Sequence, residues 1–105
     1  MSRPVLFEPE ATAELQESAL WYEAQRSGLG LAFVAAVDRA VEHLTAWPHT
    51  GATVAGVSAN LSVRKISVSR FPYYLAYVVT SDVIRVLAVA HDRRRPGYWQ
   101  PRTKP

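Results

Sequence analysis

The chain has 105 residues, 49% of them hydrophobic, with no cysteine and a formal net charge of +3. This length suits one small domain, residues 1–105, with a single core, and the hydrophobic fraction is too high for an intrinsically disordered chain. The absence of cysteine excludes disulfides and thiolate metal sites. No apolar run approaches the roughly 20 residues of a membrane span, and the N-terminus lacks the pattern of a signal peptide. We therefore expect a cytoplasmic protein that does not enter a membrane.

Charge is distributed unequally along the sequence. Residues 1–60 carry three basic and seven acidic side chains, a net charge of −4, whereas residues 61–105 carry nine basic and two acidic ones, a net charge of +7. A region as basic as the second raises the local concentration of anionic partners such as nucleic acid or an acidic peptide. The simpler alternative is a polarised surface without a partner.

The first half predicts one short strand and two helices. Residues 5–7 form an apolar stretch typical of a strand. Pro9 suits the first turn of a helix, and apolar side chains then recur at helical spacing to about Arg26. The glycines in residues 28–30 predict a tight turn into a second helix. That helix is expected to end at residues 47–48, Trp-Pro, because the residue before proline disfavours helical geometry.

The second half predicts strands. Residues 49–60 are small and weakly patterned, which is typical of a loop. Beyond them, apolar side chains alternate with period two in three segments: 61–68, 73–80 and 83–90. The result is an α+β fold in which a helical hairpin packs on a mainly antiparallel sheet of about four strands. We expect the core to span about residues 5–99, and the polar segment from Asp92, which ends in a tail at 100–105, to lie over a sheet edge or fray.

The predicted strands carry several cationic side chains. Alternation places Arg85 and His91 on one side of the last strand, and Arg64 and Arg70 on one side of the first long strand. If strand pairing joins these two sides, the four residues form one basic surface. Guanidinium groups bind phosphates by paired hydrogen bonds, and an imidazole with a pKa of about 6.5 exchanges a proton near neutral pH.

The segment RRRPGYW, residues 93–99, adds three arginines and two aromatic rings. Tyr98 and Trp99 are suited to stacking on unpaired bases. Metal-free cleavage of RNA would use His91 as the acid and nearby cations for the phosphorane, although the sequence shows no well-placed base. The simpler interpretations are a solvated histidine at a strand end and a solvated run of arginines.

Other titratable side chains are assigned no chemistry. His43 and His49 lack metal-ligand spacing with His91, so the sequence predicts no metal site and no cofactor. The glutamates of the first helix are expected to lie on an exposed face that contributes to solubility: Glu10, Glu14 and Glu17.

The order of several short motifs resembles the RelE/ParE superfamily of bacterial toxins. The motifs, spread over roughly residues 5–99, are WYE (21–23), GLG (28–30) with Phe33, VRKI (63–66), SRFPYYLAY (69–77), VLAVAH (86–91) and RRRPGYW (93–99). The superfamily's fold, a helical hairpin on an antiparallel sheet, agrees with the elements predicted above. The resemblance implies the toxin of a type II toxin–antitoxin module, often labelled a plasmid stabilisation protein. Such a toxin arrests growth unless a cognate antitoxin neutralises it.

The superfamily contains two activities. RelE-like members are metal-independent endoribonucleases that cleave messenger RNA on the ribosome, whereas ParE-like members inhibit DNA gyrase. Lys65, Arg94 and Tyr98 match the RelE pattern, and His91 resembles a late histidine that some of these ribonucleases use as an acid. Residues 67 and 74, a serine and a tyrosine, depart from it because RelE has a lysine and an arginine there.

The RFPY segment and the later histidine resemble the ParE-labelled group more closely. We therefore expect a ParE-like toxin with gyrase as its target. The alternatives are a RelE-like ribosome-dependent endoribonuclease and an inactive relative that only binds antitoxin, so enzymatic activity is left open.

Either activity implies an antitoxin whose acidic, amphipathic C-terminal segment folds over the basic half of the chain. The residues expected to be catalytic, only in a ribonuclease, are His91, Arg94 and Tyr98. The residues expected to bind partner or target are Arg64, Lys65, Arg70, Arg85, Arg93, Arg95 and Trp99.

Overall fold

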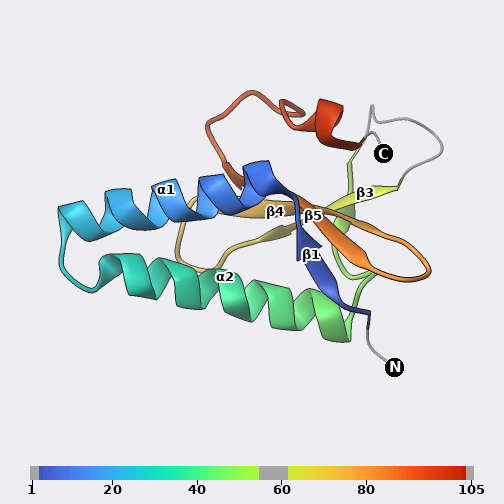
Figure 1. Cartoon of the computed structure of the whole chain (residues 1–105), viewed down its shortest axis with the longest axis horizontal. Helices are drawn as coiled ribbons and strands as arrows, with labels where there is room; N and C mark the ends of the chain where they lie inside the picture. Colours follow the sequence, from blue (N-terminus) through green and yellow to red (C-terminus); the bar gives the residue numbers. More distant parts are fainter. Residues whose placement is uncertain (1–2, 55–61, 104–105) are drawn as a thin grey trace.

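The computed structural model describes residues 3–54 and 62–103. Within these residues, two helices pack on one face of a five-stranded sheet (Figure 1). The helices are α1 (Pro9–Gln25) and α2 (Leu29–Ala46). The strands are β1 (Val5–Phe7), β2 (Ala52–Thr53), β3 (Val63–Ser67), β4 (Tyr73–Val79) and β5 (Ile84–His91). A short 3-10 helix, η1 (Gln100–Thr103), follows.

The strands are arranged in the order β1-β5-β4-β3-β2. β1 runs parallel to β5, and the other neighbours are antiparallel. The expected α+β fold, with a helical hairpin on a mainly antiparallel sheet, is confirmed. The sheet has one strand more than expected, because β2 lies in the segment predicted as a loop. A strand of two residues is too short to show an alternating pattern.

Local sequence signals set the helix boundaries. Pro9 lies in the first turn of α1, and α2 ends one residue before Trp47. Gly28 adopts a φ of 90°, which glycine tolerates without a Cβ clash. A Cβ added at Gly30 would lie 2.6 Å from the carbonyl oxygen of Ala19, so this glycine allows α2 to approach α1 closely. None of the helices described is long and apolar enough to cross a membrane.

The core between the helices and the sheet contains a compact aromatic group. Phe33 of α2 is fully buried and contacts the rings of Tyr22, Phe71 and Tyr73, with centroids about 5 Å apart. Most of these ring pairs meet edge to face, an arrangement that aromatic quadrupoles favour. The aromatic group fixes the β3–β4 turn, which carries Phe71, against the helical hairpin.

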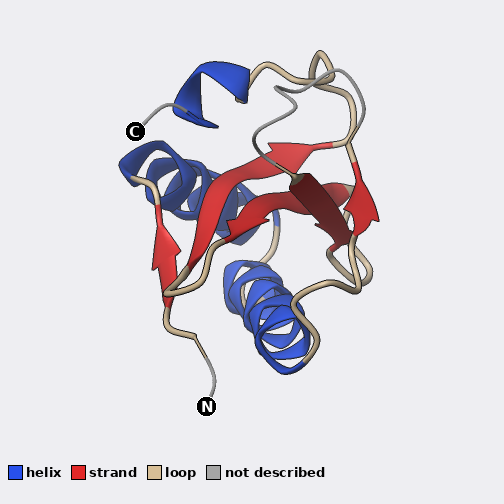
Figure 2. Ribbon diagram, turned by 90° about the vertical axis from the view of Figure 1, so that its right-hand side faces the viewer, coloured by secondary structure: helices blue, strands red, loops and turns tan. Residues whose placement is uncertain are grey.

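The second face of the sheet is covered by the C-terminal segment, residues 92–103. Trp99 is 1% exposed and packs in a cluster with small and aliphatic side chains of the sheet, among them Val63, Val78 and Leu87. Figure 2 shows η1 on the opposite side of the sheet from α2. The segment therefore neither frays nor lies only over an edge, as the sequence had suggested, but closes a second core.

Candidate functional site

A bulge in β5 changes which side chains share a face. Tyr77 pairs with Val86 and Ala76 pairs with Ala88, so Leu87 is an extra residue without a partner. A shift of one residue moves the following side chains to the other face. Strict alternation through β5 is therefore a wrong prediction.

Arg85 and His91 lie on opposite faces of the sheet as a result. Arg85 pairs with Val78, whose side chain belongs to the Trp99 cluster on the second face. His91 pairs with Tyr73, and the two rings meet edge to face, 5.0 Å apart, on the helix side. The two residues thus cannot contribute to one surface.

The remaining cations of the expected basic surface are dispersed as well. The Arg64 guanidinium donates hydrogen bonds to the carbonyl oxygens of His49 and Gly51, at 3.0 and 2.8 Å, and so holds the segment leading into β2. Arg70 lies in the β3–β4 turn. Arg85 forms an ion pair with Glu8. The single surface expected from Arg64, Arg70, Arg85 and His91 is therefore wrong.

Two further predicted binding residues lie on the second face of the sheet. The Lys65 ammonium lies 5.5 Å from the centre of the Tyr74 ring. Trp99 donates its indole N–H to the hydroxyl of Tyr74 at 3.0 Å and is buried. Because its ring is covered, Trp99 cannot stack on a base, contrary to expectation. Arg93 and Arg95 are exposed.

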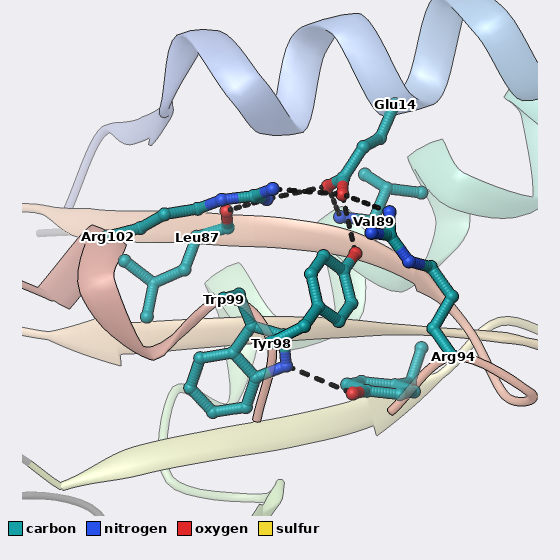
Figure 3. Close-up of polar contacts among 8 residues, drawn as sticks. Glu14, Leu87, Val89, Arg94, Tyr98, Trp99 and Arg102 are labelled. Atoms are coloured by element: carbon teal, nitrogen blue, oxygen red, sulfur yellow. Dashed lines mark hydrogen bonds and ion pairs between the residues drawn. The ribbon is translucent and has the colours of Figure 1, made fainter. Parts of the chain in front are cut away.

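A carboxylate that the sequence did not single out organises the C-terminal segment. The side chain of Glu14, 12% exposed, reaches from α1 between Arg102 and Arg94 (Figure 3). It accepts hydrogen bonds from the backbone N–H of Val89, the hydroxyl of Tyr98 and the guanidinium of Arg102. The expectation that Glu14 belongs to an exposed, solubilising face is therefore wrong.

The backbone geometry of β5 explains this arrangement. β1 ends at Phe7, so its ladder with β5 does not continue beyond Val86. Glu14 accepts the N–H of Val89 at 3.0 Å, and Arg102 donates to the carbonyl oxygen of Leu87 at 3.1 Å. Two side chains thus satisfy backbone groups that a neighbouring strand would otherwise bind.

A sequence signal for Glu14 was present. Its spacing from Ala11 and Ser18 is three and four residues, which places it beside the inward-facing positions of α1 rather than on the outer face. No local pattern identifies its partners, because Val89 and Arg102 lie 75 and 88 residues farther along the chain.

Tyr98 lies between cations and the Glu14 carboxylate. The guanidinium of Arg94 stacks 3.7 Å from the centre of its ring, and that of Arg102 lies at 5.2 Å. Burial, followed by the hydrogen bond to Glu14, raises the pKa of the Tyr98 hydroxyl well above its ordinary range. A neutral, donating phenol of this kind is a structural hydrogen-bond donor and is poorly suited to act as a general base.

Alkaline unfolding tests this state of Tyr98. Because the folded-state pKa lies above the unfolded value of about 10, the stabilising contribution is complete below about pH 10 and is lost as pH rises further. Between about pH 10 and pH 12, the free energy of unfolding should therefore fall more steeply in the wild type than in Tyr98→Phe. Urea titrations across this range measure both slopes, and equal slopes would contradict the assignment. Burial also raises the pKa values of Tyr22 and Tyr77, but these residues remain in both proteins.

His91 lines a separate groove on the helix side of the sheet. The groove has a volume of about 600 Å³, and its walls include Trp21 and Tyr22 of α1, Tyr73 of β4 and Arg93. The Nδ1 atom of His91 accepts a hydrogen bond from the Arg93 backbone N–H at 3.0 Å. Trp21, which lines this groove, is 59% exposed.

The three residues expected to form a ribonuclease site are therefore divided between two places. Arg94 and Tyr98 surround Glu14, whereas His91 belongs to the aromatic groove. The groove of His91 is also lined by Glu17 and Arg93, but neither Arg94 nor Tyr98 belongs to it. Within residues 3–54 and 62–103, no group of three or more histidine and carboxylate side chains is placed to hold a metal ion.

The fold and its sequence define a toxin of the RelE/ParE superfamily. The family model described as ParE toxin of type II toxin–antitoxin system, parDE, matches residues 5–96, and the chain belongs to this family. A solved structure described as the chromosomal ParDE toxin–antitoxin system from P. aeruginosa has a similar fold, with a TM-score of 0.71 and 19% sequence identity. The likeness covers 86% of this chain and 96% of that chain. No curated protein matches the sequence.

Proposed function

We propose that this type II toxin arrests growth by binding and inhibiting DNA gyrase, and that a cognate antitoxin neutralises it. The family match over residues 5–96 supports the gyrase target. The separation of His91 from Arg94 and Tyr98 favours binding over RNA cleavage, because general acid–base chemistry needs its groups around one reacting phosphate.

The aromatic groove beside α1 is the surface proposed to receive the antitoxin. Trp21, Tyr22 and Tyr73 provide apolar walls, and the groove carries one positive charge at Arg93 and one negative charge at Glu17. An amphipathic segment can place its apolar side chains against the rings and its carboxylates toward Arg93. Association of this kind is expected to weaken as salt is added, because part of the attraction is electrostatic.

Purified gyrase provides the direct test of the target. Added toxin should reduce supercoiling of relaxed plasmid, and the antitoxin encoded by the neighbouring gene should restore it. Unchanged supercoiling at a large molar excess would overturn the gyrase assignment. Growth arrest accompanied by transcripts cut at the ribosomal A site would instead establish the ribonuclease alternative. Overexpression without any growth defect would indicate a relative that only binds antitoxin.

The groove is tested separately with two exposed tryptophans. Trp21→Ala should weaken antitoxin binding by about tenfold or more, as loss of a central aromatic anchor does. Trp47→Ala is the matched control, because Trp47 is 65% exposed but lies outside the groove. The Trp47→Ala variant should bind the antitoxin with unchanged affinity. Equal affinities of both variants and the wild type, measured by calorimetry, would place the antitoxin elsewhere.

A further inference from the structure

A second pocket, between α2 and the β3–β4 turn, brings three arginines together. Its volume of about 370 Å³ lies within the range of small-ligand sites. The cationic lining residues are Arg26, Arg39 and Arg70. The apolar lining comes from Leu29, Ala32, Ala35 and Phe71. In Figure 1 the α1–α2 turn, which contributes Arg26 and Leu29, lies at the left-hand end, away from the C-terminal segment.

The three guanidinium groups have no acidic partner in the part of the chain that the structure describes. The ion pairs found there engage Arg85, Arg94 and Arg102 instead. No carboxylate lies among the residues that line the pocket. The three arginines are exposed, so water and salt screen their mutual repulsion, and an anion placed among them would be attracted most strongly at low ionic strength.

The backbone conformation of Arg70 is a second, independent observation that points to a role for its side chain. Arg70 has a φ of 73°, in the left-handed region that residues other than glycine rarely adopt. The following residue, Phe71, is anchored in the aromatic group and donates its N–H to the carbonyl oxygen of Val68. Glycine would fit this turn with less strain, so the presence of arginine is explained by what its guanidinium does.

We propose that this pocket binds a phosphate group of a phosphorylated ligand. A phosphate presents several terminal oxygens and up to two charges, which separate guanidinium groups can share, whereas one arginine alone satisfies the two oxygens of a carboxylate. The apolar lining with Phe71 is suited to the uncharged part of such a ligand. A nucleoside diphosphate and a nucleic-acid backbone both carry the required group.

Titration calorimetry at low salt with pyrophosphate, ADP and a short DNA duplex distinguishes the sources. All three probes should bind saturably; tightest binding of ADP indicates a nucleotide, and tightest binding of the duplex indicates nucleic acid. Arg39→Gln and Arg70→Gln should each weaken binding by about tenfold. Arg3→Gln removes the same charge outside the pocket, where Arg3 donates to the carbonyl oxygen of Thr80, and should leave affinity unchanged.

Arg70→Gly separates binding from folding. This variant removes the guanidinium while relieving the positive φ, so its thermal midpoint should be equal to or above that of the wild type, while its affinity falls as in Arg70→Gln. The proposal fails if no probe binds, if Arg3→Gln weakens binding as much as Arg39→Gln, or if poly-glutamate binds as tightly as the phosphates. The Trp21→Ala groove variant should retain phosphate binding, so failure here leaves the toxin proposal intact.

Discussion

Replacing Trp99 with alanine is expected to lower the free energy of unfolding by about 3–5 kcal/mol, the usual cost of truncating a buried tryptophan. Trp99 is buried against the sheet residues Val63 and Leu87, and its indole N–H donates to the hydroxyl of Tyr74 at 3.0 Å. The substitution would leave a cavity and an unpaired phenol beside it. Small domains have total stabilities of about 5–15 kcal/mol, so the urea midpoint should fall sharply.

An exposed tryptophan supplies the control for this measurement. Trp47→Ala removes the same side chain from the surface and should change stability by no more than about 0.5 kcal/mol. Trp99→Phe retains most of the packing, loses the hydrogen bond and should lie between the two. If Trp99→Ala were as stable as Trp47→Ala, the C-terminal segment would not be held on the sheet in solution.

The unequal charge of residues 1–60 and 61–105 has a structural explanation, whether or not the basic half also binds a partner. Each ion pair between described residues joins a carboxylate of the acidic first half to an arginine of the basic second half. Glu8 binds Arg85 beside β1, and Glu14 binds Arg94 and Arg102 beside α1. Part of the apparent basic surface is thus neutralised internally, because folding brings the N-terminal elements against β5.

The helices and most strands could be predicted because their signals are local. Pro9 begins α1, the glycines around position 28 form the turn, and the Trp47-Pro48 pair ends α2. Each of these signals depends on backbone geometry that a residue imposes on its immediate neighbours. The fold class followed from the order of such segments.

The candidate site could not be predicted to the same degree, because it depends on register and long-range pairing. One extra residue, Leu87, reverses the faces of the side chains that follow, and alternation cannot reveal a bulge. The role of Glu14 requires partners from the far end of the chain. The aromatic pair Tyr98 and Trp99 in an otherwise polar segment was the available sign that this segment packs against the protein.

Glu14→Ala is expected to reduce the free energy of unfolding by about 2–4 kcal/mol, an unusually large effect for one carboxylate. The substitution leaves the N–H of Val89 and the hydroxyl of Tyr98 without their acceptor, and it leaves the charge of Arg102, 17% exposed, without a partner. Uncompensated donors in a partly buried site cost more than an exposed ion pair contributes. Urea unfolding at neutral pH measures the difference.

Glu17→Ala is the matched control, since Glu17 lies on the same helix, carries the same charge and is exposed. Its cost should stay below about 0.5 kcal/mol. In a double-mutant cycle, Glu14→Ala and Arg102→Ala should be strongly non-additive, because each removes the same contact. Additive losses would show that Glu14 and Arg102 do not act together. A Glu14→Ala variant as stable as Glu17→Ala would mean that the open edge of β5 needs no side-chain cover.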